Sequence, residues 1–453
     1  MNIIIAGGGK VGLTLARQLS AEKHDITLID SSQSVLDTGM ERLDIIAVQG
    51  NCASMSVLLR SGVKDADLLI AVTNADEVNL LCCTTAHGIN PKLHTIARIR
   101  NPEYLEQIHK MRDVFGLSMS INPEKQAAEE IRRLLRYPGF LRRDTFAKGR
   151  TEIVELRVDA ESKLCNVSLA EMASVVKCRV LVCAVLRNGT AVAPRGNFVL
   201  RAGDRIFVTA PTENLSQMLR NLGIIARRAR QVLLCGGGRV SYYLASMLVR
   251  DGVTVQMLEM NPQRCRELAQ DLPGVCVICG DATNPALLES EGASKCDALV
   301  ALTGLDELNM VISLYGSSRN IPQVITKLGH GEDRRSIIDN LSLGSIVSPK
   351  DLCCNNIIRY VRAMGNQTGA AISVHAIADG QAEAVEFAAD NSTPNCGIPL
   401  KDLKLKPNVL IASITHGATS QVPSGNSVFL PGDVVVVVTS GRGILQQLGD
   451  IFA

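Results

Sequence analysis

The sequence predicts an α/β protein made of two tandem doubly wound parallel sheets, each followed by a smaller β-rich α+β domain. Three observations lead to this prediction: an internal repeat, short apolar runs that alternate with helix-like segments, and a glycine-rich turn after the first run of each repeat. A chain of 453 residues is also too long for one ordinary domain. We therefore expect two copies of a two-domain unit.

The internal repeat is found by comparing the chain with itself. Ile3–Gly12 recurs as Val232–Ser241, so that position 7 corresponds to position 236, an offset of 229. Asp30 and Glu259, which end the second apolar run of each copy, have the same offset. Two further pairs of segments agree to within one residue: 71–79 with 301–309, and 196–204 with 425–433. The sequence is a tandem duplication.

The front part of each copy has six short apolar runs separated by helix-like segments, which is typical of a doubly wound, Rossmann-like sheet. The expected strands lie near 2–6, 24–29, 45–48, 67–72, 93–97 and 117–121, and near 231–235, 253–258, 275–279, 297–302, 322–327 and 344–347. Asn122-Pro123-Glu124 and Ser348-Pro349-Lys350-Asp351 then predict the start of a further helix in each copy. Turn residues at Tyr137-Pro138-Gly139 and at Gly365 should end these helices.

The back part of each copy is β-rich, with turn signals such as Asn188-Gly189 and Pro431-Gly432-Asp433. The basic cluster Arg227-Arg228-Ala229-Arg230 is expected to be an exposed linker between the copies. The expected domains are 1–123, 140–225, 231–349 and 368–453.

Composition excludes several classes of protein. The 47 basic and 45 acidic residues nearly balance, and aromatic residues are sparse, which argues against a general nucleic-acid binder. Apolar runs such as Val434–Val438 are far shorter than the roughly 20 residues that a membrane-spanning helix needs. The N-terminus has no signal-peptide pattern, so we expect a cytoplasmic chain whose 14 cysteines are reduced.

The glycine-rich turns predict nucleotide binding. Gly7-x-Gly9-x-x-Gly12 joins a strand to a helix, and Asp30 follows 18 residues after Gly12. The glycines permit a tight turn, close approach of a pyrophosphate and close helix packing, and the helix N-terminus favours the phosphate charge. Asp30 should accept hydrogen bonds from ribose hydroxyls and repel a 2′-phosphate, which favours NAD(H) or an adenosine nucleotide over NADP(H).

The second copy keeps Gly236, Gly238 and Glu259 but has Ser241 in place of the third glycine, so its binding could be weaker, altered or absent. Loops after the third strands and residues at the ends of the fourth and fifth strands complete each candidate site. Arg98 and its nearest counterpart Lys327 could contact a phosphate, a neighbouring subunit or only solvent. The candidate nucleotide-binding residues are Gly7, Gly8, Gly9, Lys10, Val11, Gly12, Asp30, Asn51, Cys52, Thr73, Asn74, Arg98, Gly236, Gly237, Gly238, Arg239, Val240, Glu259, Asp281, Ala282, Thr303 and Lys327.

Catalytic and metal-binding patterns are missing from the sequence. None of the histidines at 24, 87, 94 and 109 recurs at the repeat offset, and no Tyr-x-x-x-Lys pair is present. Cys276 and Cys279 form a C-x-x-C motif within an expected strand, where positions three apart face opposite sides, so we expect core packing rather than a metal site. The pairs Cys82-Cys83 and Cys353-Cys354 should likewise be buried packing residues.

The acidic segments Asp76-Glu77 and Asp306-Glu307 begin helices after the fourth strands. They could stabilise the helix N-terminus through its dipole or form a contact surface between modules.

These motifs resemble the TrkA family of regulatory proteins of Trk-type potassium uptake systems, which carry two tandem RCK (KTN) modules. The most specific segments are Ile5–Gly12, Ala97–Tyr104 and Gly280–Pro285, and the resemblance spans essentially the whole chain. Ser241, and Asn51 where the second copy has Asp281, depart from the usual pattern.

The resemblance implies a peripheral protein on the cytoplasmic face of the bacterial inner membrane. It implies a homo-oligomeric ring of RCK modules beneath a TrkH- or TrkG-like potassium-transporter membrane subunit. It further implies binding of NAD(H) and of ATP or ADP, with no enzymatic activity. Two alternatives remain open: an NAD-dependent oxidoreductase, and an RCK-type regulator of a different channel or antiporter.

Overall fold

The computed structural model describes the chain except for residues 137–139, 225–228, 330–340, 365–370, 441–444 and 446. The chain divides into two compact units. The first unit comprises Met1–Glu129 with Ser348–Ile358, and the second comprises Glu130–Val347 with Arg359–Ala453. The turn residues expected at 137–139 and at Gly365, together with Arg227 and Arg228 of the basic cluster, lie outside the described residues.

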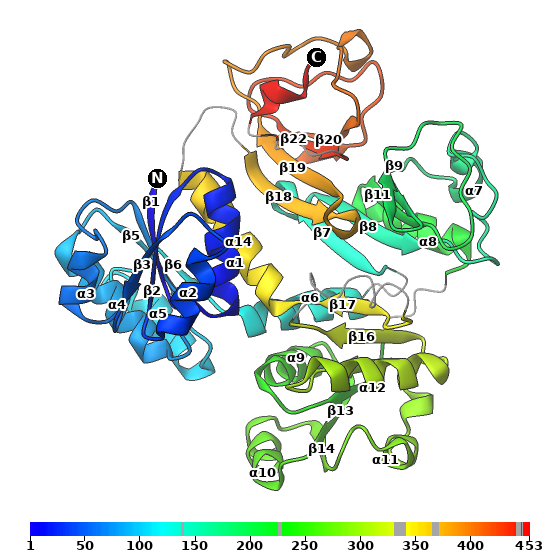
Figure 1. Ribbon diagram of the computed structural model, residues 1–453. Coiled ribbons are helices and arrows are strands. Elements are labelled where there is room, and N and C mark those ends of the chain that lie inside the picture. The colour runs from blue at the N-terminus through cyan, green and yellow to red at the C-terminus, as the bar shows by residue number, and fades with distance from the viewer. Residues whose placement is uncertain (137–139, 225–228, 330–340, 365–370, 441–444, 446) are drawn as a thin grey trace. The chain divides into compact units, whose positions relative to one another are not determined.

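The first unit contains a six-stranded parallel sheet with the order β3-β2-β1-β4-β5-β6. Its strands are β1 (Asn2–Ala6), β2 (Asp25–Asp30), β3 (Ile46–Gln49), β4 (Leu68–Ala71), β5 (His94–Arg98) and β6 (Met119–Ile121). The helices are α1 (Lys10–Ala21), α2 (Gln33–Met40), α3 (Met55–Arg60), α4 (Asp76–Ile89) and α5 (Pro102–Met111), and they surround the strands (Figure 1). This order is that of a dinucleotide-binding Rossmann sheet, with its switch point between β1 and β4.

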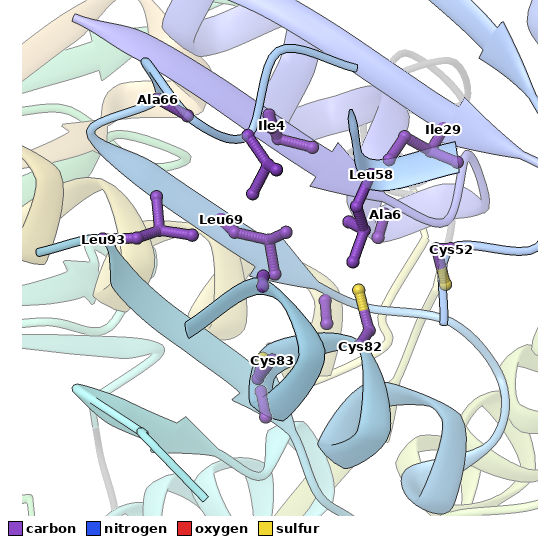
Figure 2. Packing of buried hydrophobic residues seen from close by; sticks show 14 of the residues in the cluster. Ile4, Ala6, Ile29, Cys52, Leu58, Ala66, Leu69, Cys82, Cys83 and Leu93 are labelled. Atoms are coloured by element: carbon purple, nitrogen blue, oxygen red, sulfur yellow. The ribbon is translucent and has the colours of Figure 1, made fainter. Parts of the chain in front are cut away.

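The core of the first sheet is aliphatic, as expected for strands buried on both faces. Ile4 from β1 and Leu69 from β4 pack with Leu58 of α3, and the thiols of Cys82 and Cys83 from α4 complete the cluster (Figure 2). Both thiols are fully buried, so the packing role predicted for this pair is confirmed.

The second unit repeats this sheet with the order β14-β13-β12-β15-β16-β17. Its strands are β12 (Gln231–Cys235), β13 (Thr254–Glu259), β14 (Val275–Cys279), β15 (Ala298–Ala301), β16 (Gln323–Lys327) and β17 (Ser345–Val347). The helices among them are α9 (Arg239–Arg250), α10 (Pro262–Asp271), α11 (Pro285–Ser290) and α12 (Asp306–Ser318). All twelve strands expected from the sequence are present, each within two residues of its expected bounds.

One prediction about this sheet is wrong. Cys276 and Cys279 do point to opposite faces of β14, but both side chains are exposed and do not pack in the core. The reason is that β14 is the edge strand of the sheet, so that neither of its faces is fully covered at these positions.

Each back part forms a five-stranded antiparallel sheet within the second unit, with orders β10-β9-β11-β8-β7 and β18-β19-β22-β20-β21. The first has β7 (Arg142–Phe146), β8 (Thr151–Arg157), β9 (Leu181–Arg187), β10 (Thr190–Val192) and β11 (Arg205–Ala210), with helices α7 (Met172–Val176) and α8 (Thr212–Leu222). The second has β18 (Ala371–Ile377), β19 (Ala382–Ala388), β20 (Val409–His416), β21 (Thr419–Gln421) and β22 (Val434–Thr439). Asn188 and Gly189 both have positive φ, at 50° and 73°, as the predicted tight hairpin requires.

The two antiparallel sheets share one hydrophobic core. Phe146 and Ile153 from the first pack with Ile377 and Ala384 from the second, and Figure 1 shows β7 and β8 beside β18 and β19. The backbone N–H of Ala147 also donates to the Glu386 carboxylate, at 3.0 Å. The duplicated domains therefore pair with each other inside one chain.

The helices that follow the parallel sheets are divided between the two units. α6 (Pro123–Arg136) begins in the first unit, where Asn122 Oδ1 accepts from the N–H of Lys125 at 2.8 Å, as the predicted cap requires. Its last residues belong to the second unit, where Arg132 pairs with Asp251 at 2.6 Å. α14 (Pro349–Met364) begins in the first unit, where the Cys354 thiol contacts the Val11 carbonyl, and ends in the second.

Candidate functional site

The first glycine-rich turn is shaped by close backbone contacts. Gly7 has φ of +103°, and a Cβ atom there would lie 2.9 Å from the backbone N of Thr73. A Cβ atom at Gly12 would lie 1.9 Å from the carbonyl O of Gly7. Both positions therefore require glycine, as the motif predicts. Gly9 and Lys10 are exposed at the start of α1, whose first N–H groups have no acceptor within the helix and face the turn.

Asp30 lies at the carboxyl end of β2 beside this turn. Its Oδ2 accepts a hydrogen bond from the N–H of Gly8 at 2.7 Å, and its Oδ1 accepts from the N–H of Ser32 at 2.9 Å. The side chain is half-buried, so the carboxylate keeps one side open to solvent. A carboxylate has about four acceptor positions, so Asp30 can bind ribose hydroxyls without releasing these amides.

The second turn reproduces this geometry. Gly236 has φ of +109°, and a Cβ atom there would lie 2.9 Å from the backbone N of Thr303. Glu259 accepts from the N–H of Gly237 at 2.7 Å and from the N–H of Asn261 at 2.8 Å. Gly238 and Arg239 are exposed at the start of α9, and Val240 is buried. The equivalent residues of the first copy, Gly9, Lys10 and Val11, have the same exposure.

Ser241 marks the difference between the turns. In the first copy a side chain at Gly12 would collide with the turn, whereas the Ser241 hydroxyl is fully buried and donates a hydrogen bond to the Gly236 carbonyl. The second turn therefore accommodates its larger residue by tying the helix to the turn, and its amides remain arranged as in the first copy.

The fourth strands end in matching hydrogen-bond networks. Asn79 is fully buried, and its Oδ1 accepts from the N–H of Thr73 at 2.9 Å and from the Thr73 hydroxyl at 2.7 Å. Its Nδ2 donates to the carbonyl of Arg98 at 2.9 Å. Asn309 makes the equivalent bonds to Thr303 and to the carbonyl of Lys327. Each Asn joins the ends of the fourth and fifth strands, next to the switch point, a role that the sequence analysis did not assign.

Arg98 and Lys327 are structural counterparts, and they are 229 residues apart like the two glycine-rich turns. Arg98 Nη2 donates to the Thr73 carbonyl at 2.5 Å and to Asn74 Oδ1 at 3.1 Å. Lys327 Nζ donates to the Thr303 carbonyl at 2.6 Å. Arg98 is nearly buried, with 9% of its surface exposed, so the alternative of a surface charge does not hold for it. Both cations lie at the carboxyl edge beside the turns.

The loops after the third strands lie at the carboxyl edge of each sheet. Asn51 is exposed, and its Oδ1 accepts from the N–H of Ala53, while Cys52 is buried. Asp281 is exposed and accepts from the N–H and the hydroxyl of Thr283, both at 2.8 Å, and these bonds lower the pKa of its carboxyl. Ala282 is buried, like Cys52.

The acidic segments hold the loops after the fifth strands. Asp76 Oδ2 accepts from the N–H groups of Arg100 and Asn101, both at 2.8 Å. Asp306 accepts from the N–H of Gly329 at 3.0 Å. Attraction to the helix dipole is therefore only part of their role, because these carboxylates also connect the start of α4 or α12 to the next strand.

The sequence analysis did not find one feature near the second turn. Cys265 of α10 and Cys279 of β14 meet at Glu259: the Cys265 thiol donates to the carbonyl of Glu259 at 3.2 Å, and Cys279 pairs with Glu259 in the sheet. The 13 residues between them in the sequence give no local signal for this arrangement, which depends on how α10 packs against β14.

No group of three or more His, Cys, Asp or Glu side chains that could hold a metal ion is found among the described residues. Within the same residues, no helix is both long enough and apolar enough to cross a membrane.

Comparison with protein families finds four matches along the chain. The TrkA-N domain matches residues 3–123 and 232–349, and the TrkA-C domain matches residues 153–223 and 384–452. The paired matches follow the duplication seen in the sequence and in the sheets.

Two relatives match over their full length. A Trk system potassium uptake protein TrkA homolog from Archaeoglobus fulgidus is 34% identical over 453 residues, with all of both chains covered. The Trk system potassium uptake protein TrkA from Haemophilus influenzae is 30% identical over 463 residues, covering all of this chain and 98% of the relative.

Solved structures with the same fold include the GsuK RCK domain, with a TM-score of 0.60 and 16% identity, covering 97% of this chain and 92% of that one. The GsuK channel bound to NAD gives a TM-score of 0.59 at 16% identity and covers 97% and 77% of the two chains. At this identity the likeness concerns the fold. Together, the duplicated sheets, the family matches and the full-length relatives show that this chain belongs to the TrkA family.

Proposed function

We propose that this chain is a regulatory subunit that binds nucleotides and thereby gates a Trk-type potassium uptake system. The observation that carries the proposal is the pair of glycine-rich turns, each with an acidic side chain 2.7 Å from a turn amide. These turns lie in a chain whose full-length relatives are potassium uptake proteins. Membership of that family favours potassium transport over the other channels and antiporters that share RCK modules.

The proposed ligands are NAD(H) and ATP or ADP. The turn amides and the start of α1 or α9 suit a pyrophosphate, and Asp30 or Glu259 suits unmodified ribose hydroxyls. The carboxylate next to the ribose disfavours a 2′-phosphate, so NADP(H) should bind more weakly. The solved GsuK structure with NAD supports this proposal through its shared fold.

We further propose that the protein is not an enzyme. It would act as a homo-oligomeric ring on the cytoplasmic face of the inner membrane, attached through a TrkH- or TrkG-like subunit. The proposed domains are 1–123, 140–225, 231–349 and 368–453. Gating then requires each nucleotide to bind two conformations of the ring with different affinity, because a ligand that binds both equally shifts neither population.

Calorimetric titration of the purified chain with NADH, NADPH, ATP and ADP tests the binding step. Asp30→Ala should lower affinity at the first site, and Glu259→Ala at the second, each by about tenfold or more, since hydrogen bonds to charged groups contribute about 1.5–3 kcal/mol. Asp25→Ala is the matched control, because Asp25 is an exposed acid at the opposite end of β2. If none of the four nucleotides binds the unsubstituted chain, or if both site variants bind as it does, the proposal fails.

A further inference from the structure

The thiols of Cys265 and Cys279 lie together at the edge of the second glycine-rich turn. Cys265 is in the first half of α10 and is 8% exposed, while Cys279 is the last residue of β14 and is exposed. The pKa of the Cys265 thiol is raised to about 11 by burial, by the neighbouring Cys279 thiol and by Glu259. Each of the fourteen cysteines, all within the described residues, is a free thiol.

The backbone holds these thiols together. Cys279 pairs with Glu259 across β13 and β14. The carbonyl of Glu259 accepts from the Cys265 thiol at 3.2 Å and from the N–H of Gly280 at 2.9 Å. One acceptor is thus shared by the Cys265 side chain and by the peptide next to Cys279.

We propose that Cys265 and Cys279 form a reversible thiol-modification site that low-molecular-weight disulfides oxidise to an intramolecular disulfide bond. The exposed Cys279 thiolate attacks one sulfur of the small disulfide, which forms a mixed disulfide and releases one small thiolate. Cys265 then loses its proton and attacks the Cys279 sulfur, which releases the second small thiolate. Two protein thiols are oxidised, one small disulfide is reduced to two thiols, and the two protons end on those thiols.

The first copy has an analogous pair that should not react. The Cys52 and Cys82 thiols also interact and lie in the same hydrophobic cluster (Figure 2), but Cys52 is 5% exposed and Cys82 is fully buried. A small disulfide needs access to an exposed thiolate, so the buried pair is protected. Only the second copy therefore carries the modification site.

Oxidation should change the second nucleotide site, a consequence that rests on the proposed function. The Cys265 thiol would lose the hydrogen that it donates to the Glu259 carbonyl, and α10 would be covalently tied to β14 one residue before Gly280. The Glu259 carboxylate holds the turn through the N–H of Gly237, and Asp281 lies two residues after Cys279. The disulfide thus acts on both ends of the adenosine-binding region.

The test treats the full chain with oxidised glutathione, blocks the remaining thiols by alkylation and maps the peptides by mass spectrometry. The expected result is a peptide pair linked through Cys265 and Cys279, while Cys52 and Cys82 are recovered alkylated after unfolding. Cys279→Ser should abolish the link. Cys276→Ser is the matched control, because Cys276 is exposed on the same strand but on its opposite face, and this variant should keep the link.

Other results would overturn the inference. The inference is wrong if glutathione stays attached to Cys279 and no Cys265–Cys279 link forms. It is also wrong if a link persists in Cys279→Ser, or if a Cys52–Cys82 link forms as readily.

Titration of the reduced and the oxidised chain with NADH and ADP separates this inference from the proposed function. We expect affinity at the second site to change by about fivefold or more and affinity at the first site to stay constant. A linked pair in a chain that binds neither nucleotide when reduced would contradict the proposed function and leave the thiol site standing. A chain that binds both nucleotides but forms no link would contradict only the thiol site.

Discussion

At the scale of single residues, the proposed nucleotide site depends on positions where any side chain would collide with the backbone. Gly12 is one of them, because a Cβ atom there would overlap the Gly7 carbonyl, whereas Ser241 at the equivalent position forms a hydrogen bond instead. Equivalent positions in the two copies therefore respond differently to the same substitution.

Gly12→Ala should destabilise the first unit by about 1–3 kcal/mol, since the added methyl group forces the turn and α1 apart. Nucleotide affinity at the first site should fall with it. Ser241→Ala removes one hydrogen bond and should cost only about 1 kcal/mol. Denaturant unfolding, monitored by hydrogen exchange of residues 2–21 and 231–250, measures the loss of stability in each copy. Equal losses in the two variants would contradict this account.

Asn79→Ala should lower the free energy of unfolding by about 2–3 kcal/mol, because it leaves the half-buried N–H of Thr73 without its acceptor and the carbonyl of Arg98 without its donor. Asn309→Ala should do the same in the second unit. Glu77→Ala is a suitable control on the same helix, since Glu77 is exposed. Urea titration would detect the difference, and a loss no larger than that of the control would show that the network is dispensable.

At the scale of elements, β7 and β18 are equivalent strands of the two copies that meet through unlike residues. Asp144 and His375 occupy matching positions, 231 residues apart, and Asp144 Oδ1 lies 3.0 Å from His375 Nδ1. Arg359 donates to His375 Nε2 at 3.0 Å, so Nδ1 carries the hydrogen and donates to Asp144. The duplication has thus allowed an asymmetric pair that a dimer of identical modules could not form.

The Asp144 carboxyl should contribute stability that depends on pH. Burial alone would raise its pKa, but the attraction of Arg142 and the hydrogen bond from His375 outweigh it and hold the pKa at about 2, below the usual 3.8. Because the pKa is lower in the folded state, the ionised carboxylate stabilises the folded protein at pH values above the unfolded pKa. This contribution is lost as the pH falls from about 4 to about 2. Asp144→Asn should cost about 3 kcal/mol at pH 7.

The stability gap between the unsubstituted chain and Asp144→Asn should shrink over this pH range. Chemical denaturation at pH 7, 4 and 2.5 measures it. A gap that stays constant across these values would show that Asp144 is not ionised in the folded protein.

Most of the parallel strands and the glycine-rich turns could be predicted from the sequence, for physical reasons. Buried parallel strands need continuous apolar runs, and tight turns need glycine, so strands such as β1 and β12 and the turns after them have local signals. The role of Asn79, the exposure of Cys276 and the pairing of Cys265 with Cys279 depend on contacts distant in sequence. An edge strand such as β14 has the same composition as a central one, which is why its thiols were wrongly predicted to pack in the core.

At the scale of the whole molecule, the halves of the sequence do not coincide with the compact units. The start of α14 comes from the second half of the sequence but belongs to the first unit, while the end of α6 comes from the first half and belongs to the second unit. Periodicity within a helix cannot reveal which sheet the helix covers, so the sequence did not predict this exchange.

Two substitutions in α14 should therefore act on different units. Ile357 and Val361 are both fully buried one turn apart, but Ile357 belongs to the first unit and Val361 to the second. Ile357→Ala should speed hydrogen exchange in β1 and α1, and Val361→Ala should speed it in the second unit, each with a loss of about 2–4 kcal/mol. If both variants expose the same unit, the assignment of α14 to two units is wrong.

The central claim is that nucleotide binding at the two turns controls potassium flux through a separate membrane subunit. Potassium uptake into liposomes that contain the membrane subunit should be measured with this chain or its Asp30→Ala/Glu259→Ala variant, while NADH, ADP and ATP are varied. We predict that flux responds to nucleotide with the unsubstituted chain and not with the variant, although both bind the membrane subunit. Equal responses with the two proteins, or a flux that the chain does not alter, would contradict the claim.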